Sequence, residues 1–551
     1  MTDKDRMRSF SMAGLATVCW SVAAIAQTTR PISPDDLRAR LFALAHDSMG
    51  GRETGSLGDF KAAEYLAAEF RRLGLEPAGE NGSYFQPIPF LRYHPQENRP
   101  LVVGGATLRL GADYLVAGRR YRTKPLDGVV AVASGIANDS TTWPSADQLA
   151  GRAAVVFPPA ELGRGFGAIV GFLQNPRFAK AAAVLIPVLG RLPGEAVASL
   201  LEGQITTDTT RTGEGPLVLL VSAQAAKAAL PGGGRETAPG TVGEVLSGDV
   251  GMAFSATGYP VRNVIGILRG ADRTLNETYV SVTAHHDHVG FDRAPVDHDS
   301  LRAVNRVTRP MGADSPRRDP TAEEWTEIRR LIDSLRAARP ARPDSIRNGA
   351  DDDGTGTVAL LEIAERLASG PRLRRSLLFV GHAAEERGLL GSRWYTDHAT
   401  VPVDSIVAEM DMDMIGRGGA QDLPGGGPQY LEMIGLRRLS KEYGDIFDRV
   451  NGRQPMPFVF NLSYDQPGHP LQYYCRADHY SYARYGIPSV SLSRGEHLDY
   501  HQVTDEAQYI DYDALARVTR LVAETATEIA NLDHRPLRDQ PKGDPNARCV
   551  Q

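Results

Sequence analysis

The spacing of apolar side chains follows three different patterns along the chain. Between residues 33 and 73, apolar positions three and four residues apart predict two helices. The first helix follows Ser33, a typical N-cap, and places Leu37 and Leu41 on one face. The second helix is expected over residues 59–73 and should end at Gly74.

Short apolar runs replace this pattern from about residue 97. Gly, Pro and Thr separate the runs, which predicts strands rather than helices. The β-rich character fades near residue 255, so we interpret residues 97–255 as an inserted, mostly β domain with one short helix near 177–183. The expected strands are 101–103, 129–132, 153–157, 184–188 and 217–221.

Strands and helices alternate after residue 260, which predicts an α/β sheet. We expect a three-layer α/β sandwich whose mixed, mainly parallel sheet is flanked by helices. The expected strands are 263–268, 279–284, 376–381, 406–412 and 489–493, and the expected helices are 355–368, 389–395 and 513–532. Residues 291–347 interrupt this alternation with a polar, Arg- and Pro-rich surface excursion in which we expect one amphipathic helix.

The N-terminal segment has the order of an export signal. Lys4, Arg6 and Arg8 precede an apolar run over residues 12–25, and small residues up to Ala26 suit cleavage. The alternative, a transmembrane anchor, needs about 20 apolar residues. We therefore predict a signal peptide over 1–26 and an exported protein, periplasmic or extracellular, without a membrane anchor after cleavage.

Net charge limits the expected binding partners, and the number of cysteines limits the expected disulfides. The net charge of −6 over 551 residues gives no reason to expect nucleic acid or an anionic membrane as a partner. Outside the signal the only cysteines are Cys475 and Cys549, which excludes a disulfide framework. Cys549 lies in a Pro- and charge-rich tail, 536–551, that we expect to be disordered, so pairing of the two cysteines is left open.

Five polar motifs follow the predicted strands or begin the helix between them. Ligand sites in α/β sheets lie outside the carboxyl ends of strands. Each motif alone has an ordinary explanation, such as a polar loop or an acidic helix cap. If these explanations held for all five motifs, however, each motif would have reached this edge of the sheet by chance. The motifs are AHHDH at 284–288, NGADDDGTG at 348–356, AAEERG at 383–388, DMDMIG at 411–416 and DYHQVTD at 499–505.

Two histidines and three carboxylates at one sheet edge suit zinc or another divalent first-row metal. Five ligands exceed the needs of one tetrahedral zinc, so a carboxylate shared by two ions is the natural use of the set. The adjacent Glu385 and Glu386 can diverge, so that one ligates metal while the other acts as a general base.

In order, these motifs resemble those of the co-catalytic zinc aminopeptidase family, which includes secreted bacterial leucyl aminopeptidases and glutamate carboxypeptidase II. The family shows H-x-D, G-A-x-D-x-x-S-G, E-E-x-G-x-x-G-S, D-M-x-G and Y-H, with Thr355 here in place of its serine. The resemblance covers residues 33–96 and 260–532 and implies the phosphorylase/hydrolase-like sandwich of zinc peptidases. The insert resembles, more loosely, a protease-associated (PA) domain.

The resemblance implies two zinc ions per chain and eight site residues. The implied metal ligands are His285, Asp352 as the bridge, Glu386, Asp413 and His501. The implied catalytic residues are Glu385 as general base, Asp287 as support for His285, and Tyr500 as oxyanion stabiliser.

From this resemblance we expect a zinc-dependent aminopeptidase that hydrolyses peptides from the N-terminus. The expected catalytic domain is discontinuous, 27–96 and 256–535. Three alternatives stay open: a carboxypeptidase or dipeptidase on the same scaffold, a single-zinc glutaminyl cyclase-like transferase, and a non-catalytic receptor-like binding module. The preferred side chain and the oligomeric state are not predicted.

Overall fold

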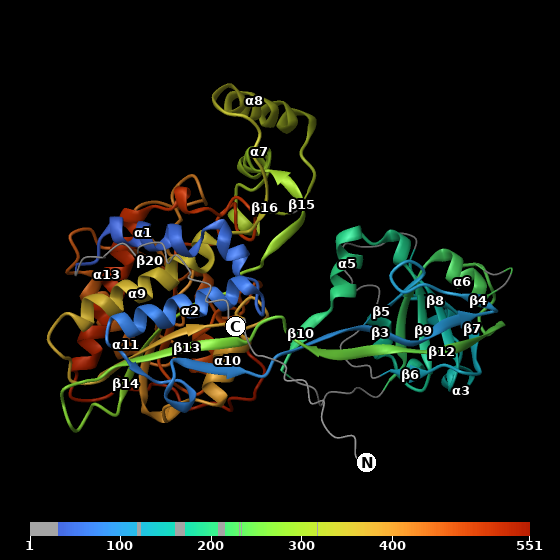
Figure 1. Cartoon of the computed structure of the whole chain (residues 1–551), viewed down its shortest axis with the longest axis horizontal. Helices are drawn as coiled ribbons and strands as arrows, with labels where there is room; N and C mark the ends of the chain where they lie inside the picture. The colour runs from blue at the N-terminus through green and yellow to red at the C-terminus, as the bar shows by residue number, and fades with distance from the viewer. Residues whose placement is uncertain are drawn as a thin grey trace, which may run out of the picture.

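The protein consists of an α/β part and a β-rich part that lie side by side, joined by two long strands (Figure 1). The computed structural model describes residues 31–117, 123–159, 171–207, 215–230, 232, 234–316 and 318–551. The expected signal peptide and its cleavage site lie outside these residues. Among the residues described, no helix is long and apolar enough to cross a membrane.

The α/β part is built on a mixed sheet with the order β1-β13-β17-β14-β18-β21-β19-β20, and β2 also pairs with β13. The central strands β17, β14, β18 and β21 are mutually parallel, and the pairs on either side of them are antiparallel. The expected mixed α/β sheet is therefore confirmed. The strands are β1 (Glu76–Pro77), β2 (Phe85–Ile88), β13 (Val261–Leu268), β14 (Tyr279–His285), β17 (Ser376–His382), β18 (Ile406–Met412), β19 (Tyr430–Ile434), β20 (Val459–Asn461) and β21 (Ser489–Ser493).

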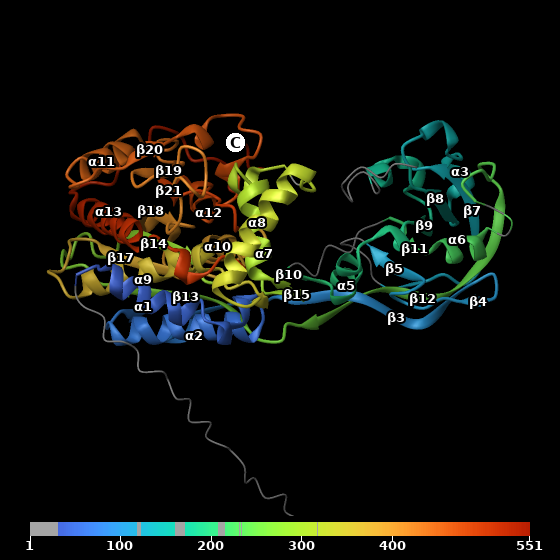
Figure 2. The same ribbon diagram turned by 90° about the horizontal axis from the view of Figure 1, so that it is seen from above.

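Helices cover both faces of this sheet, which makes three layers (Figure 2). Strand β17 shows the cause: Leu377 and Phe379 face one core, and Leu378 and Val380 face the other, because side chains alternate along a strand. One face packs on α1 (Pro34–Leu44), α2 (Leu57–Arg72), α9 (Gly356–Ala368), α11 (Lys441–Asn451) and α13 (Tyr512–Asn531). The other packs on α10 (Leu390–Asp397) and α12 (His479–Ala483).

The β-rich part has its own ten-stranded sheet and its own two cores, one on each side of the sheet. Its strands are β3 (Leu91–Val103), β4 (Ala106–Thr107), β5 (Tyr114–Ala117), β6 (Lys124–Pro125), β7 (Val129–Ile136), β8 (Ala153–Phe157), β9 (Ala183–Pro187), β10 (Gln204–Thr206), β11 (Leu217–Val221) and β12 (Val242–Ala256). Its helices include α3 (Ala146–Leu149), α5 (Gly194–Glu202) and α6 (Ala223–Ala229). The long pair β3 and β12 connects this sheet to the α/β part (Figure 1).

The helix expected near 177–183 is wrong. Only a single 3-10 turn, Pro176–Phe178, forms there. The alanines that follow favour a helix, but the chain enters the buried strand β9 at Ala183, so pairing and burial in the sheet override this local preference.

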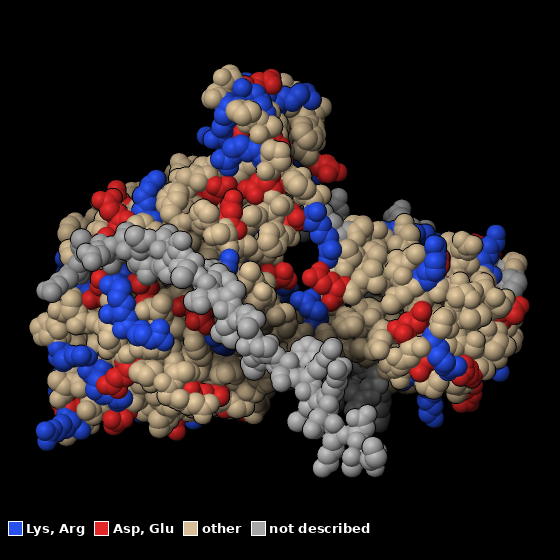
Figure 3. All heavy atoms as spheres, viewed as in Figure 1, with Lys and Arg blue, Asp and Glu red and all other residues tan. Residues whose placement is uncertain are grey.

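The excursion at 291–347 holds two helices rather than the one expected. It consists of β15 (Phe291–Asp297), α7 (His298–Thr308), α8 (Ala322–Ala338) and β16 (Pro343–Ile346), and it projects from the α/β part (Figure 1). Helix α7 escaped prediction because most of its buried residues are polar, among them His298, Asp299 and Asn305. Its buried face therefore carries no apolar periodicity. Lys and Arg side chains gather on this projection (Figure 3).

The expected disorder of the tail 536–551 is also wrong. Cys549 forms a disulfide with Cys475, and the terminal Gln551 is buried. The Gln551 side chain accepts a hydrogen bond from the backbone N–H of Tyr474 and donates to the carbonyl of Tyr464. Composition predicted a solvated tail, but one covalent link and a few polar contacts hold it on the surface.

Candidate metal centre

The first cluster of candidate ligands is centred on His285, the last residue of β14. Its Nε2 atom lies 3.3 Å from Asp352 Oδ1 and 3.6 Å from Asp413 Oδ1. Asp413 directly follows β18, which is the parallel neighbour of β14. Because parallel strands end at the same edge, residues 128 positions apart in sequence are brought together there.

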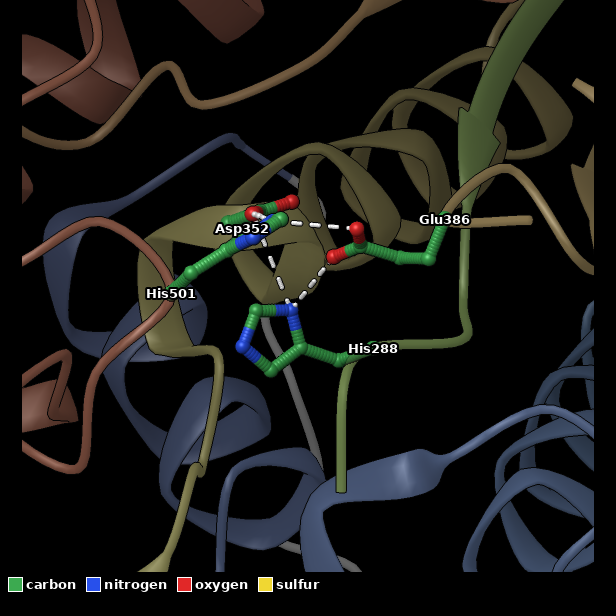
Figure 4. Close-up of side chains that lie close together, drawn as sticks. All are labelled: His288, Asp352, Glu386 and His501. Carbon is green, nitrogen blue, oxygen red and sulfur yellow. Dashed lines mark ion pairs between the residues drawn. The ribbon is translucent and has the colours of Figure 1, made fainter. Parts of the chain in front are cut away.

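The second cluster includes the other carboxylate oxygen of Asp352, together with Glu386 and His501 (Figure 4). His501 Nε2 is 3.1 Å from Asp352 Oδ2 and 2.9 Å from Glu386 Oε2. Asp352 thus offers Oδ1 to one cluster and Oδ2 to the other. The structure therefore brings the five expected ligands together as two clusters around one shared carboxylate.

A sixth residue, His288, joins the second cluster, although we had not expected it as a ligand. Its Nδ1 lies 2.9 Å from Glu386 Oε1 and 3.7 Å from Asp352 Oδ2 (Figure 4). His288 is fully buried, and with Asp352, Glu386 and His501 it places one donor atom each within 4.8 Å of the others. The signal was present in the sequence, since His288 stands three residues after His285 in the same motif.

These donor atoms fit a divalent metal. His285 Nε2, Asp413 Oδ1, Asp352 Oδ2 and His501 Nε2 are buried and have no hydrogen-bond partner among the residues the structure describes. Buried polar atoms are normally satisfied, so such a group needs an explanation. Imidazole nitrogens and carboxylate oxygens converging at 2.9–3.7 Å without hydrogen-bond geometry are the donor set that first-row divalent metals bind.

The three consecutive aspartates, 351–353, make different contacts. Asp352 alone turns into both clusters. Asp351 accepts from the backbone N–H of Gly416 at 2.7 Å, and Asp353 accepts from those of Gly356 at 2.8 Å and His285 at 3.2 Å. The flanking carboxylates thus fasten the loops after β14 and β18 to the loop before α9.

Two further buried residues hold the ligand-bearing loops. Asp505 accepts from the backbone N–H groups of Asp351 and Asp352, at 3.0 and 3.2 Å. Arg52 is fully buried and donates to the backbone carbonyls of His286 at 2.9 Å, Asn348 at 2.6 Å and Gly349 at 2.8 Å. Arg52 therefore ties the loop after β14 to the loop before α9.

Asp287 lies beneath His285 and beside Glu385. The Nδ1 of His285 faces the Asp287 carbonyl at 3.1 Å and its Oδ1 at 3.6 Å, which leaves Nε2 to face the cluster. Asp287 Oδ1 also accepts from the backbone N–H of Glu385 at 3.1 Å, and Oδ2 accepts from Thr54 Oγ1 at 2.8 Å.

Glu385 borders the first cluster without belonging to either one. Its Oε2 lies 3.9 Å from His285 Nε2. Burial raises the pKa of Glu385 well above its usual range, the charge of His285 opposes this rise, and the carboxylates of Asp413 and Glu386 add to it. A buried carboxyl group poised in this way is suited to proton transfer.

Tyr500, the remaining expected site residue, stacks on His501 with ring centroids 3.8 Å apart. A cavity opens beside the clusters, and Tyr500 lines it together with Asp352, Glu385 and Asp413. The structure thus places all eight expected residues at one edge of the sheet, and four of them line one cavity.

The chain is similar to known proteins over the region that holds these residues. Residues 263–526 match the model of Peptidase family M28. These residues, slightly less than half of the chain, are similar to that family. The family match covers β13 to α13 and therefore every candidate ligand.

Two curated relatives are aminopeptidases by name. Aminopeptidase Y of Saccharomyces cerevisiae is 30% identical over 225 residues, which are 37% of this chain and 38% of that protein. Leucine aminopeptidase 1 of Paracoccidioides brasiliensis is 29% identical over 197 residues, 33% of this chain and 46% of that protein. The chain thus spans less than half the length of these relatives. Among solved structures, the aminopeptidase from Aneurinibacillus sp. strain AM-1 aligns over 93% of this chain and 98% of its own, with 17% identity and a TM-score of 0.48.

Proposed function

We propose that the protein is a zinc-dependent aminopeptidase that holds two zinc ions. Two groups of candidate ligands carry this proposal: His288, Asp352, Glu386 and His501 in one, and His285, Asp353 and Asp413 in the other. Asp352 Oδ1 lies 3.3 Å from His285 Nε2 of the second group, and Glu385 lies beside it. His285 and Asp413 would hold one ion, and Glu386 and His501 the other, with Asp352 between them. Bound there, zinc supplies Lewis acidity and lowers the pKa of coordinated water.

The chain's own residues then position and move protons. Glu385 accepts a proton from the attacking water and donates it to the leaving amine, which is general acid–base catalysis by one carboxyl group. Asp287 holds the Glu385 backbone and orients the imidazole of His285. Tyr500 lines the same cavity and would stabilise the negative charge that develops on the scissile carbonyl oxygen.

Support for peptide substrates comes from the family and from the names of the relatives, both aminopeptidases. Mass spectrometry of the products from one peptide with free ends, beside the same peptide acetylated at its N-terminus, tests the proposal. We expect stepwise N-terminal loss from the free peptide and no reaction with the acetylated one. C-terminal loss would instead identify a carboxypeptidase.

We also propose that the protein is exported and processed near Ala26. The N-terminal charge and apolar pattern motivate this proposal, and the disulfide between Cys475 and Cys549 suits an oxidising compartment. N-terminal sequencing of the protein from its native host should give a start near Gln27. A mature chain beginning at Met1 in the cytoplasm contradicts it.

The β-rich insert, in our proposal, shapes access to the cavity and supplies no catalytic group. Glu202, at the end of α5, forms an ion pair of 2.6 Å with Arg293, so the insert contacts the excursion. Substitution of Glu202 should change the length of peptide that is cut and leave the metal content unchanged. Loss of metal from a folded Glu202→Ala variant would refute this role.

A further inference from the structure

The cavity beside Glu385 continues beyond the candidate ligands and the general base. Its remaining walls combine apolar, hydroxyl and charged side chains. These walls are Met414, Ile434, Ala477, Tyr473, Ser491, Ser493, Arg476, Glu432 and Glu496.

The register of the sheet places an acidic group in this pocket. Strand β19 pairs antiparallel with β21, so that Glu432 lies opposite Ser493 and Ile434 opposite Ser491. Residues directly opposite in an antiparallel pair project from the same face, as do residues two apart on one strand. Ile434 and Glu432 therefore line the cavity in succession along one strand.

Glu432 lacks a positive partner. It is 3% exposed, and Tyr430 donates a hydrogen bond to its carboxylate. Among the described residues, no Lys or Arg forms an ion pair with Glu432. The other acidic wall residue, Glu496, is paired with Arg476. Glu432 is thus the carboxylate of these walls that remains without a counter-charge.

Burial of this kind is costly for a carboxylate. Burial, together with the nearby Glu496 and Asp314, raises the pKa of Glu432 to about 8 even though Tyr430 stabilises the charged form. A buried carboxylate becomes favourable when a cation reaches it with good geometry. Without a cation, Glu432 is therefore largely protonated at neutral pH, and a positively charged group that enters the pocket would stabilise its charged form.

The excursion closes the pocket on the side of Glu432. The backbone N–H of Ala313 donates to the carbonyl of Glu496 at 2.9 Å. Met311 and Asp314 of the excursion line an adjoining cavity that shares Glu432 with the first one, and Tyr473 donates to Asp314 at 3.2 Å. A side chain that enters past Glu385 would meet Glu432 in a space covered from outside.

We propose that this pocket receives the side chain of the substrate's N-terminal residue and that Glu432 makes it selective for lysine or arginine. The inference rests on the proposed aminopeptidase function. The methylene stem of such a side chain packs against Met414, Ile434 and Ala477, while its charged end pairs with Glu432. Long basic side chains combine an apolar stem and a charged end in this way.

The test compares lysine with norleucine, which has the same straight chain without the charge. In the zinc-loaded wild-type enzyme we expect kcat/KM for an N-terminal lysine to exceed that for norleucine at least tenfold. Glu432→Gln should lower kcat/KM for lysine by about 10- to 100-fold, because a buried ion pair is lost, and change that for norleucine by less than about threefold. Glu524→Gln, which removes a charge from the exposed side of α13, is the matched control and should change neither.

Three outcomes overturn the inference. Equal losses for both substrates would mean that Glu432 serves the common α-ammonium group. A wild-type preference for norleucine would mean that the pocket is apolar in function. If only neutral residues are released, and never lysine or arginine, the aminopeptidase proposal stands but the role of Glu432 is wrong. If no N-terminal residue is released from any peptide, the aminopeptidase proposal and the role of Glu432 are both wrong.

Product inhibition keeps the inference testable if Glu432→Gln does not fold. We expect L-lysine to inhibit hydrolysis by the wild-type enzyme at concentrations at least tenfold below those of L-norleucine. Equal inhibition by the two amino acids contradicts the assignment of Glu432.

Discussion

Replacing Glu385 with glutamine separates the general base from the metal ligands. The substitution keeps the size of the side chain and the backbone N–H that donates to Asp287 Oδ1 at 3.1 Å. The Glu385 carboxylate lies farther from His285 Nε2, at 3.9 Å, than do those of Asp352 and Asp413, at 3.3 and 3.6 Å. We therefore expect the Glu385→Gln variant to fold and to keep its metal.

The expected loss is in rate. General acid–base catalysis contributes about 10²- to 10⁴-fold, and each tenfold factor is worth about 1.36 kcal/mol, so the activation free energy should rise by about 2.7–5.4 kcal/mol. The matched variant is Glu386→Gln, which alters a carboxylate 2.9 Å from both His288 and His501. Because a neutral amide is a poorer ligand, this variant should lose metal.

The assay combines kcat/KM on one peptide with metal content by inductively coupled plasma mass spectrometry. Circular dichroism confirms that both variants fold. If Glu385→Gln loses metal while Glu386→Gln keeps two zinc ions and merely slows, the assignment of the two glutamates is reversed.

Three other predictions test a buried ion-pair network, a candidate metal ligand and the disulfide. Arg40 is buried in ion pairs with Glu69, Glu362 and Glu365 at 2.5–2.6 Å. Because Arg72 also pairs with Glu69 and Glu365, Arg40→Leu leaves Glu362 unpaired and should lower the free energy of unfolding by about 3–5 kcal/mol in urea titration. A loss below about 1 kcal/mol would contradict this. His288→Ala should weaken metal binding by about 10- to 100-fold in chelator competition, whether His288 binds the ion or orients Glu386, and unchanged affinity would remove it from the centre. Cys475→Ser should destabilise the protein by about 2–4 kcal/mol, and the double variant with Cys549→Ser should match it; a larger loss in the double variant would mean that the cysteines act separately.

Much of the sheet could be predicted because its strands are buried on both faces. Strand β18 reads as a nearly continuous apolar run that ends in aspartates, so both its position and the motif that follows were visible in the sequence. The grouping of the five motifs at one edge followed from the same fact, since the ends of parallel strands share one edge, and the family resemblance then indicated the individual ligands.

The parts that could not be predicted depend on contacts between distant segments. Helix α7 buries polar side chains against other polar side chains, so it shows no apolar stripe. Composition alone could not distinguish Asp351 and Asp353, which accept backbone hydrogen bonds, from Asp352, which faces both clusters; only the family resemblance indicated Asp352. Glu432 is placed at the cavity by the pairing of β19 with β21, and no local sequence pattern connects these two strands.

Counting the metal ions tests the central claim most directly. The protein is stripped with a chelator, zinc is returned in steps, and bound zinc and peptide hydrolysis are measured at each step. Two clusters that share Asp352 predict saturation at two zinc ions per chain, no hydrolysis in the metal-free protein and full hydrolysis at saturation. Saturation at one zinc ion, or full hydrolysis by a verified metal-free preparation, would contradict the account.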